Sequence, residues 1–157
     1  MTREELLDRL PPCGLMCYTC PGFRGGAVQR HAAALLKLKE GFREFLGQWY
    51  DDLTELDQYL ARLSNDAHPG CPGCRKCGGA GGGCIPGCFI PACAQERGVD
   101  FCAQCEQFPC QRVAQSDLYG EPVKRAFREG GELIRRHGPE GFFNLRKDTS
   151  HYLHYKQ

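Results

Sequence analysis

The sequence has 157 residues, enough for one domain, and only 41% of it is apolar even when the cysteines are counted, so we expect a modest hydrophobic core. Residues 1–10 are charged and lack the apolar run of a signal peptide, and no stretch approaches the roughly 20 apolar residues of a membrane span. These features predict a cytoplasmic protein with no membrane contact. The net charge of +1 would become negative if thiolates bound metal, which disfavours nucleic-acid binding because that requires a positive surface.

A short helix is predicted at the N-terminus. Thr2 and Glu5 have the spacing of a capping box, in which each side chain accepts a hydrogen bond from the backbone N–H of the other residue. The helix should end near Leu10, because Pro11 and Pro12 cannot continue it.

Three cysteines follow within eight residues, at positions 13, 17 and 20. Their C-x3-C-x2-C spacing is also that of the cluster motif in radical S-adenosylmethionine enzymes. Those enzymes usually carry an aromatic residue where this chain has Thr19, and they require a large βα barrel that the remaining length cannot supply. We therefore interpret the three cysteines as ligands of a closed metal site.

Residues 27–63 are predicted to form an αα-hairpin. Apolar residues recur at helical spacing over residues 27–49, from Val28 to Trp49, and a second amphipathic helix is indicated by leucines from Leu53 to Leu63. Gly41 is a candidate site for a kink in the first helix or for its division into two. The Phe and Trp side chains of the first helix are expected to pack in the core.

Residues 71–110 form a cysteine-rich segment that holds nine of the twelve cysteines and a run of glycines at 78–83. Most gaps between neighbouring cysteines are too short for unstrained disulfides, whereas a Cys-x-x-Cys turn directs two thiolates at one point, as a tetrahedral metal requires. The segment has few apolar side chains, so metal is expected to supply its stability and the core is expected to lie elsewhere.

Two further helices are predicted after this segment. Pro109 is expected at the first position of one helix, which would place Cys110 in its first turn as a metal ligand. Another helix should begin at Glu121–Pro122 and end at Gly138–Pro139, before an aromatic helical segment that docks on the core. We predict a mostly α fold in a single domain, 1–157, in which residues 111–157 form a helical C-terminal segment.

All twelve cysteines are candidate metal ligands: Cys13, Cys17, Cys20, Cys71, Cys74, Cys77, Cys84, Cys88, Cys93, Cys102, Cys105 and Cys110. Their number fits three sites of four cysteines, and two sites with spare cysteines, among them Cys77, is the alternative. His68 could replace a cysteine. The fourth ligand of the N-terminal trio is expected from Cys102–Cys110, which would join the two ends of the chain around the helical hairpin.

The ordered motifs resemble one bacterial and archaeal family, the domain-of-unknown-function family 3795, described as presumably zinc-binding. The resemblance covers roughly residues 13–115 and rests on Cys13-x-x-x-Cys17-x-x-Cys20-Pro21, Cys71-x-x-Cys74-Arg75, Cys88-x-Ile90-x-x-Cys93, Glu96-Arg97-Gly98-Val99 and Phe101-Cys102-x-x-Cys105-x-x-Phe108-Pro109-Cys110. It implies metal binding and an intracellular location but no reaction. The chain departs from the pattern at Pro91 and in the glycine run.

Two functions are compatible with these residues. The first is a zinc-binding interaction module with closed cysteine-ligated sites, two to three zinc ions and a protein partner. No nucleophile, base or nucleotide loop accompanies the cysteines, so a catalytic role is disfavoured. The alternative is an iron–sulfur protein for electron transfer or redox sensing, because Cys71-x-x-Cys74-x-x-Cys77 matches the opening of a bacterial ferredoxin run. The next cysteine, Cys84, lies further along the chain than such a run requires.

Overall fold

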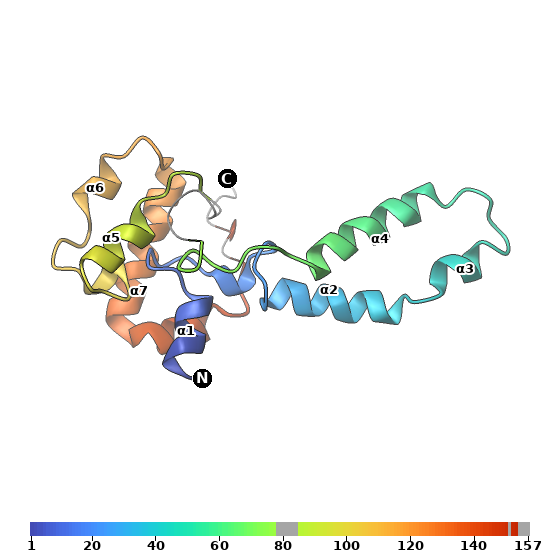
Figure 1. Ribbon diagram of the computed structural model, residues 1–157, viewed down its shortest axis with the longest axis horizontal. Coiled ribbons are helices and arrows are strands. Elements are labelled where there is room, and N and C mark those ends of the chain that lie inside the picture. Colours follow the sequence, from blue (N-terminus) through green and yellow to red (C-terminus); the bar gives the residue numbers. More distant parts are fainter. Residues whose placement is uncertain (78–84, 151, 154–157) are drawn as a thin grey trace.

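A computed structural model describes residues 1–77, 85–150 and 152–153. Figure 1 shows a body that contains both ends of the described chain and a long helical arm that extends from it. The described residues form seven α-helices and no named strand, which confirms the predicted mostly α class for this part of the chain. None of their helices is long and apolar enough to cross a membrane.

The N-terminal helix α1 (Arg3–Arg9) begins and ends where the sequence predicts. The Glu5 N–H donates to Thr2 Oγ1 at 3.2 Å, and the Thr2 N–H donates to Glu5 Oε2 at 2.8 Å, so the capping box is complete. Its C-cap Leu10 is fully buried, which fixes the helix against the body.

The arm consists of α2 (Ala27–Leu38), α3 (Phe42–Leu46) and α4 (Thr54–Ala67), with α2 and α4 packed along each other and α3 at the far end (Figure 1). The helical pattern predicted over 27–49 is interrupted. The helix α2 ends at Leu38, and Gly41 adopts φ +77°, a left-handed conformation that an L side chain rarely takes. The chain therefore turns before α3 begins.

The predicted core position of the arm's aromatic residues is wrong. The side chains of Phe42, Phe45 and Trp49 are all exposed, because the end of the arm lies away from the body and no further helix among residues 1–77, 85–150 and 152–153 covers it (Figure 1). Helical periodicity identified a shared face, but a face is buried only where another element packs on it.

The body contains α5 (Ile90–Glu96), α6 (Gln111–Ala114) and the long α7 (Glu121–Arg146), together with two 3₁₀ turns, η1 (Cys17–Thr19) and η2 (Cys102–Gln104). The predicted start of α7 at Glu121–Pro122 is confirmed, and so is the break at Gly138, where φ is +70° and the helix changes direction. The helix after Pro109 begins later than predicted, at Gln111, so that Cys110 is its N-cap residue and does not lie in its first turn.

Two clusters of buried side chains form the core of the body. One joins Leu10, Met16 and Phe101 to the end of α7, and the other joins Cys13, Ile90, Tyr119 and Phe127. Phe101 and Ile90 are only 1% and 3% exposed, so the expectation that the core lies outside the cysteine-rich segment is wrong. The segment contributes few apolar side chains, but these are among the most deeply buried in the protein.

The backbone of Cys13–Gly14 lies directly against α7. An atom placed at the Cβ position of Gly130 would be 2.1 Å from the Gly14 carbonyl oxygen, and one on Gly131 would be 2.4 Å from the Phe108 ring. Gly14 itself has φ +83°. Only glycines allow this approach. It places Cys13 beside α7.

Candidate metal centre

Backbone hydrogen bonds bring the separate cysteine-bearing segments together. The Cys102 N–H donates to the Pro12 carbonyl at 2.8 Å, which places Cys102 next to Cys13. The Arg24 N–H donates to the Cys71 carbonyl at 2.9 Å, and the Cys71 N–H donates to the Gly22 carbonyl at 3.0 Å. These two bonds hold the beginning and the end of the arm together, so the segment after Cys20 lies beside Cys71.

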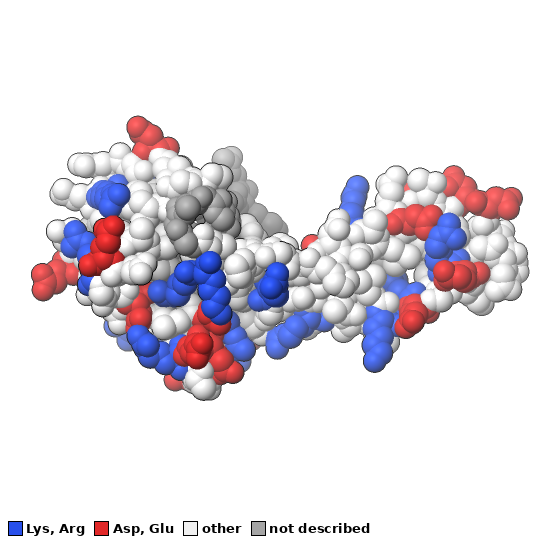
Figure 2. Space-filling model, in the orientation of Figure 1, with Lys and Arg blue, Asp and Glu red and all other residues white. Residues whose placement is uncertain are grey.

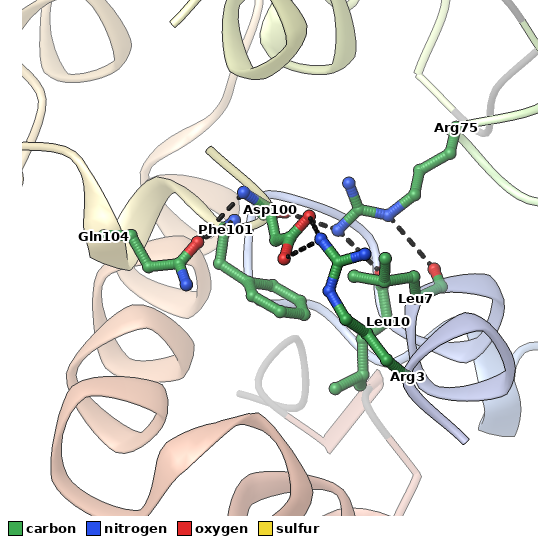
Figure 3. Close-up of polar contacts among 7 residues, drawn as sticks. All are labelled: Arg3, Leu7, Leu10, Arg75, Asp100, Phe101 and Gln104. Carbon is green, nitrogen blue, oxygen red and sulfur yellow. Dashed lines mark hydrogen bonds and ion pairs between the residues drawn. The ribbon is translucent and has the colours of Figure 1, made fainter. Parts of the chain in front are cut away.

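Arg75 joins three of these segments (Figure 3). Its Nε donates to the Leu7 carbonyl at 3.1 Å, and its Nη2 donates to the carbonyls of Leu10 and Asp100, while the guanidinium lies 5.2 Å from the centroid of the Phe101 ring. Burial lowers the pKa of Arg75, and nearby negative groups, Asp100 first among them, oppose that shift. The side chain therefore holds residues 71–77 against the end of α1 and against the turn before η2.

Asp100 is held from two more directions (Figure 3). Its two carboxylate oxygens accept from Arg3 Nη2 at 2.7 and 2.6 Å, and the backbone N–H groups of Asp100 and Phe101 both donate to Gln104 Oε1 at 2.9 Å. These contacts fix the backbone just before Cys102.

Arg135 fixes the other side of the same turn from α7. Its Nε donates to the Ala103 carbonyl at 2.6 Å and its Nη2 to the Cys105 carbonyl at 3.1 Å, and the guanidinium lies 4.6 Å from the centroid of the Phe108 ring. Arg135 thus holds the Cys-x-x-Cys turn at 102–105 through its carbonyl oxygens.

Cys13 lies at the centre of the gathered thiols. Burial raises the pKa of Cys13 well above its usual range, a backbone hydrogen bond from Leu15 opposes the shift, and the neighbouring thiols of Cys74, Cys102 and Cys88 add to it. A buried thiolate without a cation is costly, so the proton-bearing thiol is favoured in the metal-free protein.

Cys102 occupies the middle of a second, overlapping group. Its pKa is raised to about 12, first by burial and then by the neighbouring thiols of Cys93, Cys110, Cys105 and Cys88. Cys102 and Cys88 are thus shared between the surroundings of Cys13 and those of Cys93, Cys105 and Cys110. None of Cys13, Cys88, Cys93, Cys102, Cys105 and Cys110 is joined in a disulfide.

Polar side chains contact the sulfur atoms of this group. Tyr119 Oη donates to Cys88 Sγ at 3.3 Å, and burial together with this bond raises the pKa of Tyr119. Arg97 Nη1 lies 3.9 Å from Cys105 Sγ, and its pKa is raised by a hydrogen bond to Cys93 and by the charge of Cys105. Donors to sulfur stabilise thiolate charge, as the surroundings of metal–thiolate centres do.

The remaining candidate ligands belong to residues 17–20 and 71–77 or fall outside the described residues. Cys74 is near enough to Cys13 to raise the pKa of that thiol. Cys20 Sγ lies 3.3 Å from Tyr152 Oη, and Cys71 Sγ accepts from its own turn, from the Gly73 N–H at 3.4 Å. Cys17 is close enough to Arg75 to affect its pKa, and Cys77 is half-buried. Cys84 falls outside the described residues.

His68, the candidate replacement ligand, is exposed at the end of α4. Its Nδ1 lies 2.8 Å from the Ser64 carbonyl oxygen. The ring is therefore engaged by its own helix end.

The thiols are neighbours, but they are not in coordinating geometry. Within residues 1–77, 85–150 and 152–153, no three Cys, His, Asp or Glu side chains are grouped closely enough to hold one metal ion. A cavity of about 130 Å³ borders Cys13, Cys102 and Cys110, and apolar side chains such as Phe127 form much of its wall. The donor set near it is dominated by thiols, which suits zinc, copper(I) or iron–sulfur clusters in its chemistry, while metal binding would require the sulfur atoms to move closer.

Sequence reasoning missed several residues that organise this centre. Tyr119 lies outside every motif and carries no signal in the sequence, because its contact with Cys88 joins residues 31 positions apart. Arg75 and Arg97 do stand within the motifs quoted above, next to or near cysteines. A basic residue beside a thiolate pair is a signal that could have assigned them a role.

The comparisons with known proteins give a family and no function. No curated protein and no solved structure matches the chain. The model of one family, described as "Protein of unknown function (DUF3795)", matches residues 9–115, which span the N-terminal cysteines, the arm and the cysteine-rich segment. That match covers more than half of the sequence, and the chain belongs to this family.

Proposed function

We propose that the protein is a cytoplasmic zinc-binding protein in which cysteine thiolates hold two to three ions in closed structural sites, and that the metal-bound body serves as an interaction module for a protein partner. The observation that supports this most directly is the convergence of six described thiols from three separate segments without a disulfide among them. A reducing cytoplasm keeps such thiols available for metal.

Metal binding at this place would have to offset the cost of deprotonating buried thiols. Cys13 is buried and Cys102 half-buried, and each is surrounded by further thiols, so ionisation without a cation is unfavourable. A zinc ion replaces the thiol protons and offsets two of the four negative charges of a four-thiolate site, and structural zinc binding contributes roughly 10 kcal/mol or more to folding. Side-chain rotation of a few cysteines is a small cost against that gain.

The existing contacts would position the ligands. Arg135 and Gln104 hold the 102–105 turn, and Arg75 holds residues 71–77 close to it. Tyr119 would donate to the Cys88 thiolate. These side chains would position the cysteine ligands without binding the metal themselves. The proposal contains no catalytic step.

Iron–sulfur binding is the second candidate. The donors to sulfur from Tyr119 and Arg97 favour it, since hydrogen bonds to cluster sulfurs are one means by which proteins set a cluster's reduction potential. The cavity of about 130 Å³ beside Cys13 and Cys102 also offers more room than a single ion needs.

Metal analysis of protein purified without oxygen tests both candidates. A colourless protein with two to three zinc per chain supports the first, and a brown protein with iron and acid-labile sulfide supports the second. Protein that retains no metal under these conditions, or that takes up none on refolding with zinc or with iron and sulfide, contradicts both.

A pair of variants then tests the assignment of ligands. Cys102→Ser should lose about one metal equivalent. Phe101→Leu disturbs the neighbouring core but keeps every thiol, so it should retain the full metal content. Equal metal content in the two variants would show that Cys102 is not a ligand.

A further inference from the structure

The far end of the arm exposes apolar side chains that no other described part of the chain covers. We define the arm tip as residues 38–57, which include α3 and the start of α4. Among its side chains, Leu38 is 84% exposed, Phe45 54%, Trp49 62% and Tyr50 60%. The rings of Phe45 and Trp49 contact each other edge to face, with centroids 4.8 Å apart, so these two side chains form one continuous apolar surface.

This arrangement differs from the scattered exposed apolar residues of an ordinary surface. Single exposed leucines or aromatics are common, but a gathered patch with a polar rim marks an interaction site. The patch belongs to α3 and the residues after it, at the end of the arm that is farthest from the body (Figure 1). If these aromatic side chains served only to pack against the body, they would be expected at the end of the arm that joins the body.

The charges around the patch are predominantly negative. The arm tip contains six Asp or Glu residues and two Lys or Arg residues. Both cations are engaged within the arm: Arg43 forms an ion pair with Asp57, and the Lys39 ammonium lies 5.4 Å and 5.3 Å from the ring centroids of Phe42 and Tyr59.

The other carboxylates leave the rim negative. Asp52 caps α4 by accepting from the Thr54 N–H at 3.0 Å. Glu40, Glu44 and Asp51 form no ion pair within the described chain. Red acidic side chains gather around the free end of the arm on the face shown in Figure 2.

We propose that the arm tip is a docking site for a basic amphipathic helix of a partner protein, whose apolar face covers Phe45 and Trp49 and whose Lys or Arg side chains pair with the surrounding carboxylates. Apolar contact would supply most of the affinity, and the opposite charges would orient the partner and speed its association. A second arm tip would bring like charges together, and an anionic membrane would be repelled by the same carboxylates.

The inference is independent of the metal proposal, because no cysteine lies between Cys20 and Cys71. Failure of one therefore leaves the other unaffected.

The chain offers its own probe for this test, since Trp49 is its single tryptophan. The full-length protein is titrated with a synthetic amphipathic helix of Leu and Lys while the Trp49 emission is recorded. Saturable binding with a shift of the emission to shorter wavelength is expected, because docking removes the indole from water. A Leu and Glu helix of the same periodicity should produce no shift.

Variants locate the binding surface. Phe45→Ala keeps the fluorophore and should weaken binding of the Leu and Lys helix by about tenfold or more. Glu44→Gln combined with Asp51→Asn should weaken it and reduce its dependence on salt. Leu145→Ala, which removes a comparably exposed apolar side chain from α7, should leave the affinity unchanged.

Four outcomes of the titrations would overturn the inference. They are the absence of a shift with the Leu and Lys helix, equal binding of the Leu and Glu helix, an equal loss in Leu145→Ala and Phe45→Ala, and a shift that appears only with phosphatidylglycerol vesicles. An emission maximum that changes with protein concentration alone would assign the surface to a second copy of this chain, and would likewise overturn it.

Discussion

Replacing Gly130 by alanine tests the close approach of α7 to the segment that carries Cys13. The new Cβ would lie 2.1 Å from the Gly14 carbonyl oxygen and 2.9 Å from the Gly14 carbonyl carbon. A carbon and a carbonyl oxygen normally come no closer than about 3.3 Å, so the two segments must separate by roughly 1 Å. Both partners are backbone atoms, and no side-chain rotation can relieve the contact.

The magnitude follows from two opposing effects. Alanine stabilises a helix interior by about 1 kcal/mol relative to glycine, which favours the variant. Overpacking typically costs about 1–3 kcal/mol, and a backbone-to-backbone clash belongs at the upper end of that range. We expect a net loss of about 2 kcal/mol in the free energy of unfolding, which corresponds to a fall of about 1 M in the urea midpoint for a chain of this size.

Urea unfolding followed by the helical circular dichroism signal measures this effect. Gly70→Ala is the matched control, since its Cβ would meet no atom within 4 Å and its φ lies outside the left-handed region; its midpoint should change little. If Gly130→Ala proved as stable as the natural protein or more stable, helix propensity would dominate and the contact between α7 and Gly14 would be wrong.

Three further substitutions test the polar contacts of the body, each by its urea midpoint. Arg75→Met should lower the free energy of unfolding by about 2–3 kcal/mol, because it leaves buried carbonyls unpaired, and a loss below about 1 kcal/mol would contradict a joining role. Arg3→Ala should cost less than about 1 kcal/mol, because its ion pair with Asp100 is largely exposed, and a larger loss would mean that this pair matters more than its exposure suggests. Tyr119→Phe should cost about 0.5–1.5 kcal/mol through the lost bond to Cys88, and an unchanged midpoint would argue against that bond.

Local signals in the sequence predicted the helix ends well. The capping box of Thr2 and Glu5, the proline at the start of α7 and the break at Gly138 each act within one or two turns of the backbone. Such signals depend mainly on neighbours in the sequence, which explains their success here, although Pro109 shows that they can fail: its helix begins only at Gln111.

Periodicity was a weaker guide to burial. The apolar repeat over residues 27–49 continued past Gly41, and it was the glycine itself that indicated the division of the helix found there. The repeat also indicated a buried face for Phe45 and Trp49, whereas the tertiary arrangement leaves that face uncovered. The sequence states which side chains share a face, but only the path of the chain decides whether another element reaches it.

The candidate ligands illustrate the same difference between what local sequence indicates and what the tertiary arrangement decides. Their identity followed from residue type and spacing, since thiols at Cys-x-x-Cys intervals have a known chemistry. Their grouping did not, because Cys13 meets Cys88 and Cys102 through contacts across some ninety residues, such as the bond from the Cys102 N–H to the Pro12 carbonyl.

The closed base of the arm explains how such distant cysteines can be neighbours at little cost. Gly22, Arg24 and Cys71 are joined by backbone hydrogen bonds, and Gln29 Nε2 donates to the Ala67 carbonyl at 3.1 Å, so the chain leaves and re-enters the body at one place. The loop-closure entropy grows only slowly with loop length, and α2 packed on α4 already orders most of the excursion. For the body, the whole arm is therefore equivalent to a short loop, because its two ends are joined where they leave and re-enter the body. Thiols in the body and aromatic side chains at the arm tip can then be selected for separate tasks, because a change in one places little strain on the other.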